Sequence, residues 1–190
     1  MRLALCIVSS TLAACATVPS PTAVDSPAAD RGDRVAIYLG ARALDDDDYE
    51  PVEKQAMIGF EYSHEKPDDA VGFEFGLMGS GDEDDIGGFD VKASTGELYV
   101  GMRKTFGQEN VHPYVGGGLS IIAAEVDVSG SEDDDASPAV YAHAGVRFDA
   151  SESFFLAVDA RVLVGSDLEL GGVETDADYG QLAFVFGFAL

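Results

Sequence analysis

The chain has 190 residues, 46% of them hydrophobic, and a formal net charge of −24. One sizeable folded domain fits this length, and the apolar content excludes a disordered acidic chain. Binding to nucleic acid is also excluded, because the sequence shows no basic patch that would neutralise phosphates.

The first residues predict an export signal. Arg2 precedes a short apolar stretch up to Leu12, which is too short to cross a bilayer as a helix. The small residues that end in Cys15 fit a bacterial lipobox, with cleavage before the cysteine and a lipid on its sulfur. Ordinary cleavage after Ala16 is the alternative, and both interpretations export the protein. We expect a signal peptide over residues 1–14 and lipid attachment at Cys15.

Residues 15–34 predict a flexible periplasmic tether, because Pro, Ser, Thr, Ala and Asp dominate this segment. The chain has two cysteines, Cys6 and Cys15, and both lie in the N-terminal segment. A disulfide framework in the folded domain is therefore excluded.

From Val35 onward, large apolar residues alternate with small or polar ones, which is the pattern of β-strands. Each run is close to the roughly 9–11 residues that a tilted strand needs to cross a bilayer. The alternation predicts eight strands, over residues 35–43, 55–63, 70–78, 93–105, 112–124, 139–149, 153–164 and 179–190.

The two faces of these strands differ in character. One face carries large apolar side chains such as Ile37 and Leu98, and the other carries glycines and isolated charges. Glycine is depleted in ordinary strands, but small residues suit the narrow interior of a small barrel. We therefore expect apolar side chains to face lipid and small or polar ones to face the lumen. The alternative, a soluble periplasmic barrel that binds an apolar ligand, places these phenylalanines inside: Phe73, Phe75, Phe184 and Phe186.

Charges of opposite sign balance on the small-residue face. They are four arginines and four carboxylates: Arg42, Arg103, Arg147, Arg161, Glu61, Glu74, Glu97 and Asp159. Buried charges must be paired, since removing one partner typically costs about 3–5 kcal/mol. An upper group is predicted from Arg42, Glu97 and Arg161. A lower group is predicted from Glu61, Glu74, Arg103, Arg147 and Asp159. Ordinary exposed strand charges are the alternative for some of them.

The connections alternate between long acidic segments and short turns. The long ones have net charges of −5, −4, −5 and −5, which make up −19 of the total, and they cover residues 44–54, 79–92, 127–138 and 165–178. The shorter ones cover residues 64–69, 106–111 and 150–152. Antiparallel strands place all long connections at one end, as in outer-membrane barrels, and leave the short turns and both termini on the periplasmic side.

Two segments carry a family resemblance. Residues 112–119, HPYVGGGL, are similar to a PYVGxG stretch of small outer-membrane barrels, and the apolar alternation up to Leu190 is similar to their terminal strand signal. Residues 35–190 thus resemble the family of the OmpA transmembrane domain, OmpX and the opacity proteins, which usually ends in Phe rather than Leu. The resemblance implies an all-β, eight-stranded antiparallel up-and-down transmembrane β-barrel, inserted by the barrel-assembly machinery.

The acidic connections are candidates for weak binding of divalent cations. The residues are Asp82, Asp84, Asp85, Asp133, Asp134 and Asp135. A specific calcium loop is not expected, because Ile86 and Gly87 break the required spacing of ligands. A solvated, repulsive surface is the alternative. We expect no specific metal site and no cofactor.

His143 is the histidine predicted to face the lumen, where Asp159 is its expected partner. A lipid A-modifying enzyme would need a nucleophile beside it, and Ser120 is the nearby lumen serine. Gly116–Gly118 lies inside a strand with no helix after it, so a phosphate-binding loop is excluded. The chain is therefore expected not to be an enzyme.

The sequence as a whole predicts an outer-membrane barrel with a structural or surface-interaction role. A narrow channel for ions or small solutes is an alternative. The expected partners are outer-membrane lipids, lipopolysaccharide and divalent cations, and not nucleic acid.

Overall fold

The computed structural model describes residues 32–44, 52–66, 69–86, 89–107, 109–128 and 131–190. The predicted signal peptide, Cys15 and nearly all of the predicted tether lie outside the described residues. The described residues contain no helix that is long and apolar enough to span a bilayer.

Eight long strands and one small hairpin make up the structure. The long strands are β1 (Asp33–Leu44), β2 (Lys54–His64), β3 (Gly72–Ile86), β4 (Phe89–Thr105), β5 (Val111–Val128), β6 (Ser131–Asp149), β7 (Phe154–Val164) and β10 (Tyr179–Ala189). The hairpin consists of β8 (Leu168–Leu170) and β9 (Val173–Thr175). All neighbouring strands are antiparallel, as expected for an up-and-down arrangement.

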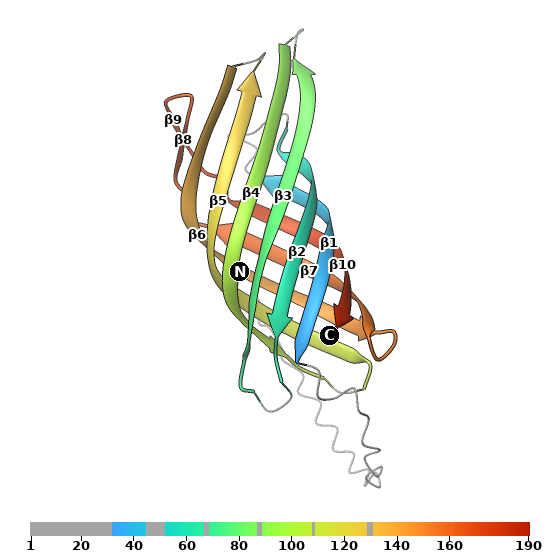
Figure 1. Cartoon of the computed structure of the whole chain (residues 1–190). Helices are drawn as coiled ribbons and strands as arrows, with labels where there is room; N and C mark the ends of the chain where they lie inside the picture. The colour runs from blue at the N-terminus through green and yellow to red at the C-terminus, as the bar shows by residue number, and fades with distance from the viewer. Residues whose placement is uncertain (1–31, 45–51, 67–68, 87–88, 108, 129–130) are drawn as a thin grey trace, which may run out of the picture.

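The eight long strands close into a barrel in the order β1-β10-β7-β6-β5-β4-β3-β2 (Figure 1). Closure is made by the first and last strands, which pair from Arg34 opposite Ala189 to Leu44 opposite Tyr179. This confirms the predicted eight-stranded antiparallel barrel. β1 begins at Asp33, inside the segment that the sequence predicts to be tether.

Alternation separates the two faces of the wall. Large apolar side chains such as Ile58, Leu98 and Phe184 point outward and are 60–65% exposed. The alternating positions point inward, and most of them are buried. The phenylalanines named above are also exposed: Phe73, Phe75, Phe184 and Phe186. Their outward orientation contradicts the alternative of a soluble barrel with an apolar interior.

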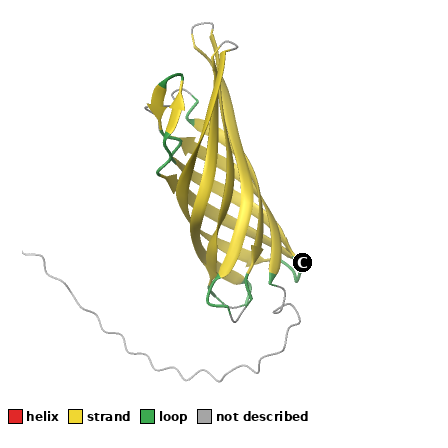
Figure 2. Cartoon of the chain, turned by 60° about the vertical axis from the view of Figure 1, so that its left-hand side comes forward, coloured by secondary structure: helices red, strands yellow, loops and turns green. Residues whose placement is uncertain are grey.

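Four strands continue beyond the end of the barrel. β3, β4, β5 and β6 project together at the end opposite to the C-terminus (Figures 1 and 2). Pairing of β3 with β4 continues to Ile86 opposite Phe89, and pairing of β5 with β6 continues to Val128 opposite Ser131. The prediction of long loops at 79–92 and 127–138 is therefore wrong for most of both segments. The acidic residues of these segments hide the apolar alternation by which strands are recognised. They are compatible with strands here, because charges are tolerated on strand faces that meet water.

Apolar side chains also fill the interior at this end. Ile122 and Ala124 of β5 are buried together with Leu168 and Leu170 of β8. β8 contacts β5 and β6, and Figure 2 shows its hairpin beside the projecting strands. The projecting end of the barrel thus has a small core, which the β8–β9 hairpin helps to cover.

Candidate functional site

Glu97 of β4 is the centre of an ion-pair cluster inside the barrel. Its carboxylate lies 3.0 Å from Arg42 Nη2 and accepts a further charged bond from Arg161 Nη2. The hydroxyls of Tyr179 and Ser120 donate to it over 2.5 and 2.9 Å. One buried carboxylate on β4 therefore serves two guanidinium groups that reach across the barrel from β1 and β7.

The two arginines of this cluster also stack on tyrosine rings. Arg42 Cζ lies 3.8 Å from the centroid of Tyr179, and Arg161 Cζ lies 3.7 Å from that of Tyr141. Arg42 Nη1 also donates to Thr95 Oγ1 over 2.7 Å. Such stacking stabilises a guanidinium that has left water.

A second cluster surrounds Arg103, also on β4. Arg103 Nη2 lies 2.7 Å from Glu61 Oε1, and Arg103 Nε lies 2.7 Å from Glu74 Oε2. The hydroxyls of Tyr38 and Tyr99 donate to Glu61 Oε2 over 2.9 and 3.0 Å. Glu61 and Glu74 are at most 2% exposed, so both carboxylates depend on these partners.

His143 links the second cluster to Asp159. Its Nδ1 lies 2.9 Å from Asp159 Oδ2, and its Nε2 lies 2.9 Å from Glu74 Oε1. The hydroxyls of Tyr114 and Tyr141 donate to the same two carboxylates over 2.8 Å each. Both ring nitrogens of His143 therefore face a carboxylate oxygen. This placement favours a protonated imidazole, because its positive charge would match the fourth carboxylate of the two clusters.

The structure brings together most of the charged residues that the sequence assigns to the lumen. Arg42, Glu97 and Arg161 form the upper group. Glu61, Glu74 and Arg103 form the lower group, and Asp159 joins it through His143.

Arg147 departs from the prediction. Its Nε donates to Asp149 Oδ1 over 2.8 Å instead of pairing with the lower group. Asp159 on β7 lies opposite Gly145, which is two residues before Arg147 along β6, so Asp159 is not directly opposite Arg147. Asp149 is two residues along β6 and on the same face as Arg147, so it reaches the guanidinium first.

Sequence reasoning missed the role of tyrosine. Five tyrosines at inward-facing positions are at most 5% exposed, and their hydroxyls take part in the clusters: Tyr38, Tyr99, Tyr114, Tyr141 and Tyr179. The alternation could have identified these tyrosines, because each occupies an inward-facing position of its strand, as the charged lumen residues do.

Glycines make room for these large groups. A Cβ atom at Gly116 would overlap the His143 ring, and one at Gly101 would overlap the Tyr141 hydroxyl and the backbone of Gly117. The small residues of the inner face therefore make room for the rings of nearby strands.

Two of the aspartates predicted to bind cations, Asp133 and Asp135, instead bond the backbone of the β8–β9 hairpin. Asp135 and Asp133 of β6 accept hydrogen bonds from the backbone N–H groups of Glu169, over 2.8 Å, and Gly171. Bonds from the backbone of Glu169 and Ala136 hold the pKa of Asp135 below its usual range. These two carboxylates thus fasten the β8–β9 hairpin to β6.

The other candidates lie on the projecting strands. Asp82, Asp84 and Asp134 are exposed there, and Asp85 lies on β3 with a side chain outside the described set. In the described part of the chain, no group of three or more His, Cys, Asp or Glu residues converges as a metal site.

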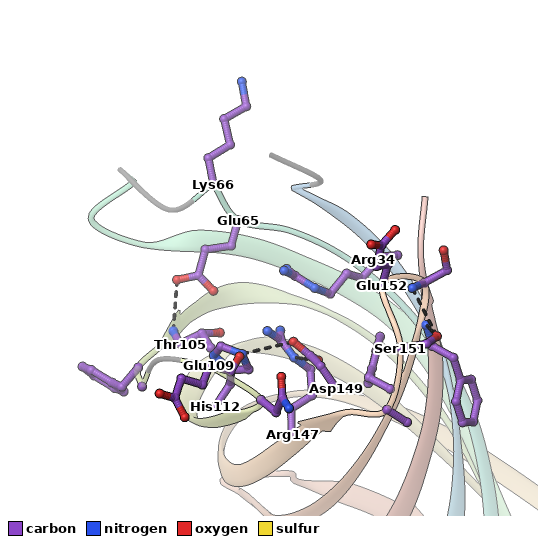
Figure 3. Close-up of a pocket in the computed structure, with 18 of the residues that line it drawn as sticks. Arg34, Glu65, Lys66, Thr105, Glu109, His112, Arg147, Asp149, Ser151 and Glu152 are labelled. Carbon is purple, nitrogen blue, oxygen red and sulfur yellow. Dashed lines mark hydrogen bonds and ion pairs between the residues drawn. The ribbon is translucent and has the colours of Figure 1, made fainter. Parts of the chain in front are cut away.

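The opposite mouth of the barrel, where β1 begins and β10 ends (the terminal mouth), holds an open pocket of about 720 Å³ (Figure 3). Charged residues of both signs line it, among them Arg34, Glu65, His112, Arg147 and Asp149. Sequence analysis did not single out this pocket, because its residues come from strand ends and turns far apart in the chain.

Comparison with protein families matches residues 10–190 to the outer membrane protein beta-barrel domain. A comparison with curated proteins finds no match.

Solved structures share the fold at low identity. Neisserial surface protein A gives a TM-score of 0.67 at 16% identity, covering 84% of this chain and 97% of that one. Ail, the attachment invasion locus protein of Yersinia pestis, gives a TM-score of 0.58 at 13% identity, covering 83% of this chain and 97% of that one. The N-terminal barrel domain of Pseudomonas aeruginosa OprF gives a TM-score of 0.50 at 15% identity, covering 82% of this chain and 96% of that one. With a closed eight-stranded barrel, an apolar outer face and a family match over nearly its whole length, the chain belongs to the outer membrane protein β-barrel family.

Proposed function

We propose that the protein has a structural or surface-interaction role, in which the charge-paired lumen seals the barrel and the projecting acidic strands meet the surroundings. The first and last strands start and end at the same mouth, opposite to the projecting strands. Outer-membrane barrels have short periplasmic turns and longer external connections. The proposal therefore places both termini in the periplasm and the projecting part of β3–β6 outside the cell.

The observation that carries this proposal is the filled lumen. Arg42, Glu97 and Arg161 are at most 4% exposed and join opposite walls through shared hydrogen bonds. The interior of an eight-stranded barrel is just wide enough for side chains to fill. A continuous water path does not fit such an interior, so we assign the function to the exposed projecting end and not to chemistry at His143.

The projecting strands carry acidic side chains on exposed positions. Asp82, Asp84 and Asp134 are exposed, and Lys92 pairs with Glu83 over 3.1 Å. Ail has been crystallised with the heparin analogue sucrose octasulfate, which is a polyanion. The acidic surface of the present protein would repel such a ligand. We propose instead that it associates with positively charged partner surfaces, or with divalent cations that bridge to lipopolysaccharide phosphates.

The outer wall supports lipid as the second partner. Its exposed apolar side chains include Ile58, Leu98 and Phe184. Aromatic rings pack in pairs near the terminal mouth, with Phe154 and Phe188 centroids 5.4 Å apart. Aromatic residues mark the bilayer interface in membrane barrels. The apolar alternation of β10 would be the signal for the barrel-assembly machinery.

Export is part of the same proposal. A signal peptide over residues 1–14 would deliver the chain, and a lipid on Cys15 would anchor it in the periplasmic leaflet. β1 starts at the terminal mouth, so the tether would begin on the side where that lipid sits.

Cell fractionation followed by SDS-PAGE with and without boiling tests the closed barrel. We expect the protein in the outer-membrane fraction, with a migration that changes on heating. Orientation is tested by labelling single cysteines in intact cells with a reagent that does not cross the membrane. Ser94→Cys lies exposed on β4 near the projecting end, and Ala150→Cys lies exposed in a turn at the terminal mouth.

We expect Ser94→Cys to react in intact cells and Ala150→Cys to react only after permeabilisation. The reverse labelling would overturn the orientation. Recovery of the unmodified protein in the soluble periplasmic fraction, with no heat shift, would overturn the membrane role itself.

A further inference from the structure

The pocket at the terminal mouth has a volume of about 720 Å³. Its wall combines the ends of β1, β4, β5, β6 and β7 with the turns that join them. In a chain with a net charge of −24, this pocket gathers several cations: Arg34, Lys66, Lys104 and Arg147.

Four acidic residues also line the pocket: Glu65, Glu109, Asp149 and Glu152. Asp149 accepts from Arg147 Nε over 2.8 Å and lies 3.1 Å from His112 Nε2. Glu65 accepts from the backbone N–H of Thr105 over 3.0 Å and lies 3.6 Å from Lys104 Nζ. These two carboxylates thus already bond other residues of the pocket wall.

Arg34 supplies a further guanidinium to the pocket wall. It occupies an inward-facing position of β1 and is half-buried, and Figure 3 shows its side chain reaching into the opening. It forms no hydrogen bond or ion pair with any residue in the described part of the chain. Charges of both signs surround it: Arg147 and Arg103 carry the same charge, whereas Asp149 and Glu65 carry the opposite one. A half-buried guanidinium that makes no hydrogen bond leaves its N–H donors open to an anion.

Arg147 adds donors to the same site. It bonds Asp149 through Nε, and within the described residues its two Nη groups make no hydrogen bond. Guanidinium groups present a planar fork of N–H donors that matches carboxylate and phosphate oxygens. Arg34 and Arg147 thus offer two such forks to one opening.

We propose that this pocket binds a compact oxyanion, a carboxylate or a phosphate, held by Arg34 and Arg147. The periplasmic location of the ligand rests on the proposed orientation of the barrel, whereas the binding chemistry does not. A carboxylate would come from a peptide with a free C-terminus, and a phosphate from free phosphate or a phosphorylated headgroup.

The test uses the full chain folded in detergent micelles and follows the arginine Nε–Hε signals by NMR. Three probes are titrated separately: inorganic phosphate, N-acetyl-alanyl-alanine, and the same dipeptide with an amidated C-terminus. We expect saturable shifts of the Arg34 and Arg147 signals with at least one of the two anions and none with the amide. Saturation by the dipeptide alone would identify a peptide carboxylate, and saturation by phosphate alone would identify a phosphate group.

Two variants show whether the site is specific. Arg34→Gln removes one fork, and we expect the affinity to fall about tenfold or more, as for loss of a charge-assisted hydrogen bond. Lys54→Gln removes the same charge at the other end of the barrel and should leave the affinity unchanged. Both variants should keep the heat-dependent migration of a folded barrel.

Lack of saturation with every probe, or an equal loss in Arg34→Gln and Lys54→Gln, would overturn the proposal. Either result leaves the proposed orientation intact, because the titration does not depend on it. Failure of the cysteine-labelling experiment would in turn leave the anion site standing but move it to the other side of the membrane.

Discussion

Tyrosine hydroxyls accompany the cations at each buried carboxylate of the lumen. Glu61, Glu74 and Asp159 each accept a bond from at least one tyrosine in addition to a charged donor. A neutral hydroxyl satisfies a lone pair without adding charge. The interior therefore stays electrically balanced while its carboxylates gain the additional bonds that a buried charge needs.

Replacement of the central carboxylate should show how much this balance contributes. In Glu97→Gln, Arg42 and Arg161 lose their shared counter-charge while they remain buried. We expect the free energy of unfolding in lipid vesicles to fall by about 3–5 kcal/mol. Urea titration read from the folded and unfolded bands on unheated gels measures it. Glu152→Gln in an exposed turn is the control, and equal stability of the two variants would contradict the argument.

His143 provides a second prediction at this scale. Because both of its nitrogens face carboxylates, we expect ¹⁵N NMR at neutral pH to show a proton on each nitrogen. His143→Gln can donate to only one of the two carboxylates and should be less stable than the parent protein. A ring with a single proton would contradict the ion-pair arrangement described for Glu74 and Asp159.

At the scale of the element, β6 holds the β8–β9 hairpin with side chains in place of backbone carbonyls. Asp133, Asp135 and Ser137 alternate along one face of β6 and accept from the N–H groups of Gly171, Glu169 and Asp167. This spacing repeats that of a paired strand, because both segments are extended. The hairpin thereby covers apolar residues at the projecting end of the barrel.

Removal of one such acceptor should loosen the hairpin. In Asp135→Ala we expect faster hydrogen exchange at the Glu169 amide and faster proteolysis near Gly171. Asp134→Ala is the matched control, because Asp134 lies on the opposite face of the same strand. Equal protection of the hairpin in both variants would show that Asp135 does not fasten it.

The same contact predicts a dependence on pH. The pKa of Asp135 is lowered by its backbone bonds, so the contact contributes fully above the ordinary value of about 3.9 and is lost as the pH falls through the lowered value. The Glu169 amide shift should titrate with a midpoint below that of an ordinary aspartate. A midpoint at or above the ordinary value would contradict the assignment.

At the scale of the whole molecule, charge is arranged by depth. The lumen holds ion pairs, the projecting strands are acidic, and charges of both signs line the pocket at the terminal mouth. This order follows from dielectric environment, because unpaired charge is tolerated in water and costly inside the barrel. A positively charged partner is thus favoured at the projecting end.

The filled lumen predicts electrical behaviour. We expect the purified barrel to show no steady open channel in planar bilayers, because Arg42, Glu97 and Arg161 bridge its interior. Glu97→Gln loosens this bridge and should give transient currents at most. A steady single-channel conductance of the parent protein would contradict the sealed lumen and favour the alternative of a narrow channel.

The number of strands, their antiparallel order and the faces of their side chains could be predicted from sequence. A period of two is a local property, and each strand displays it independently of its neighbours. The charged residues of the lumen were found by the same rule. This rule did not identify the projecting parts of β3–β6 as strands. Acidic side chains occupy both faces there, because water replaces lipid, and they hide the alternation.

Which groups meet inside the barrel was decided by tertiary structure. Partners depend on the stagger of strands around a closed sheet, and no local pattern contains it. Closure brings Glu97 of β4 between Arg42 of β1 and Arg161 of β7. It leaves the Arg34 guanidinium without a hydrogen bond in the described chain, although Arg34 faces inward as the alternation requires. The period of the sequence thus determined the wall of this protein, and the register between strands determined the chemistry within it.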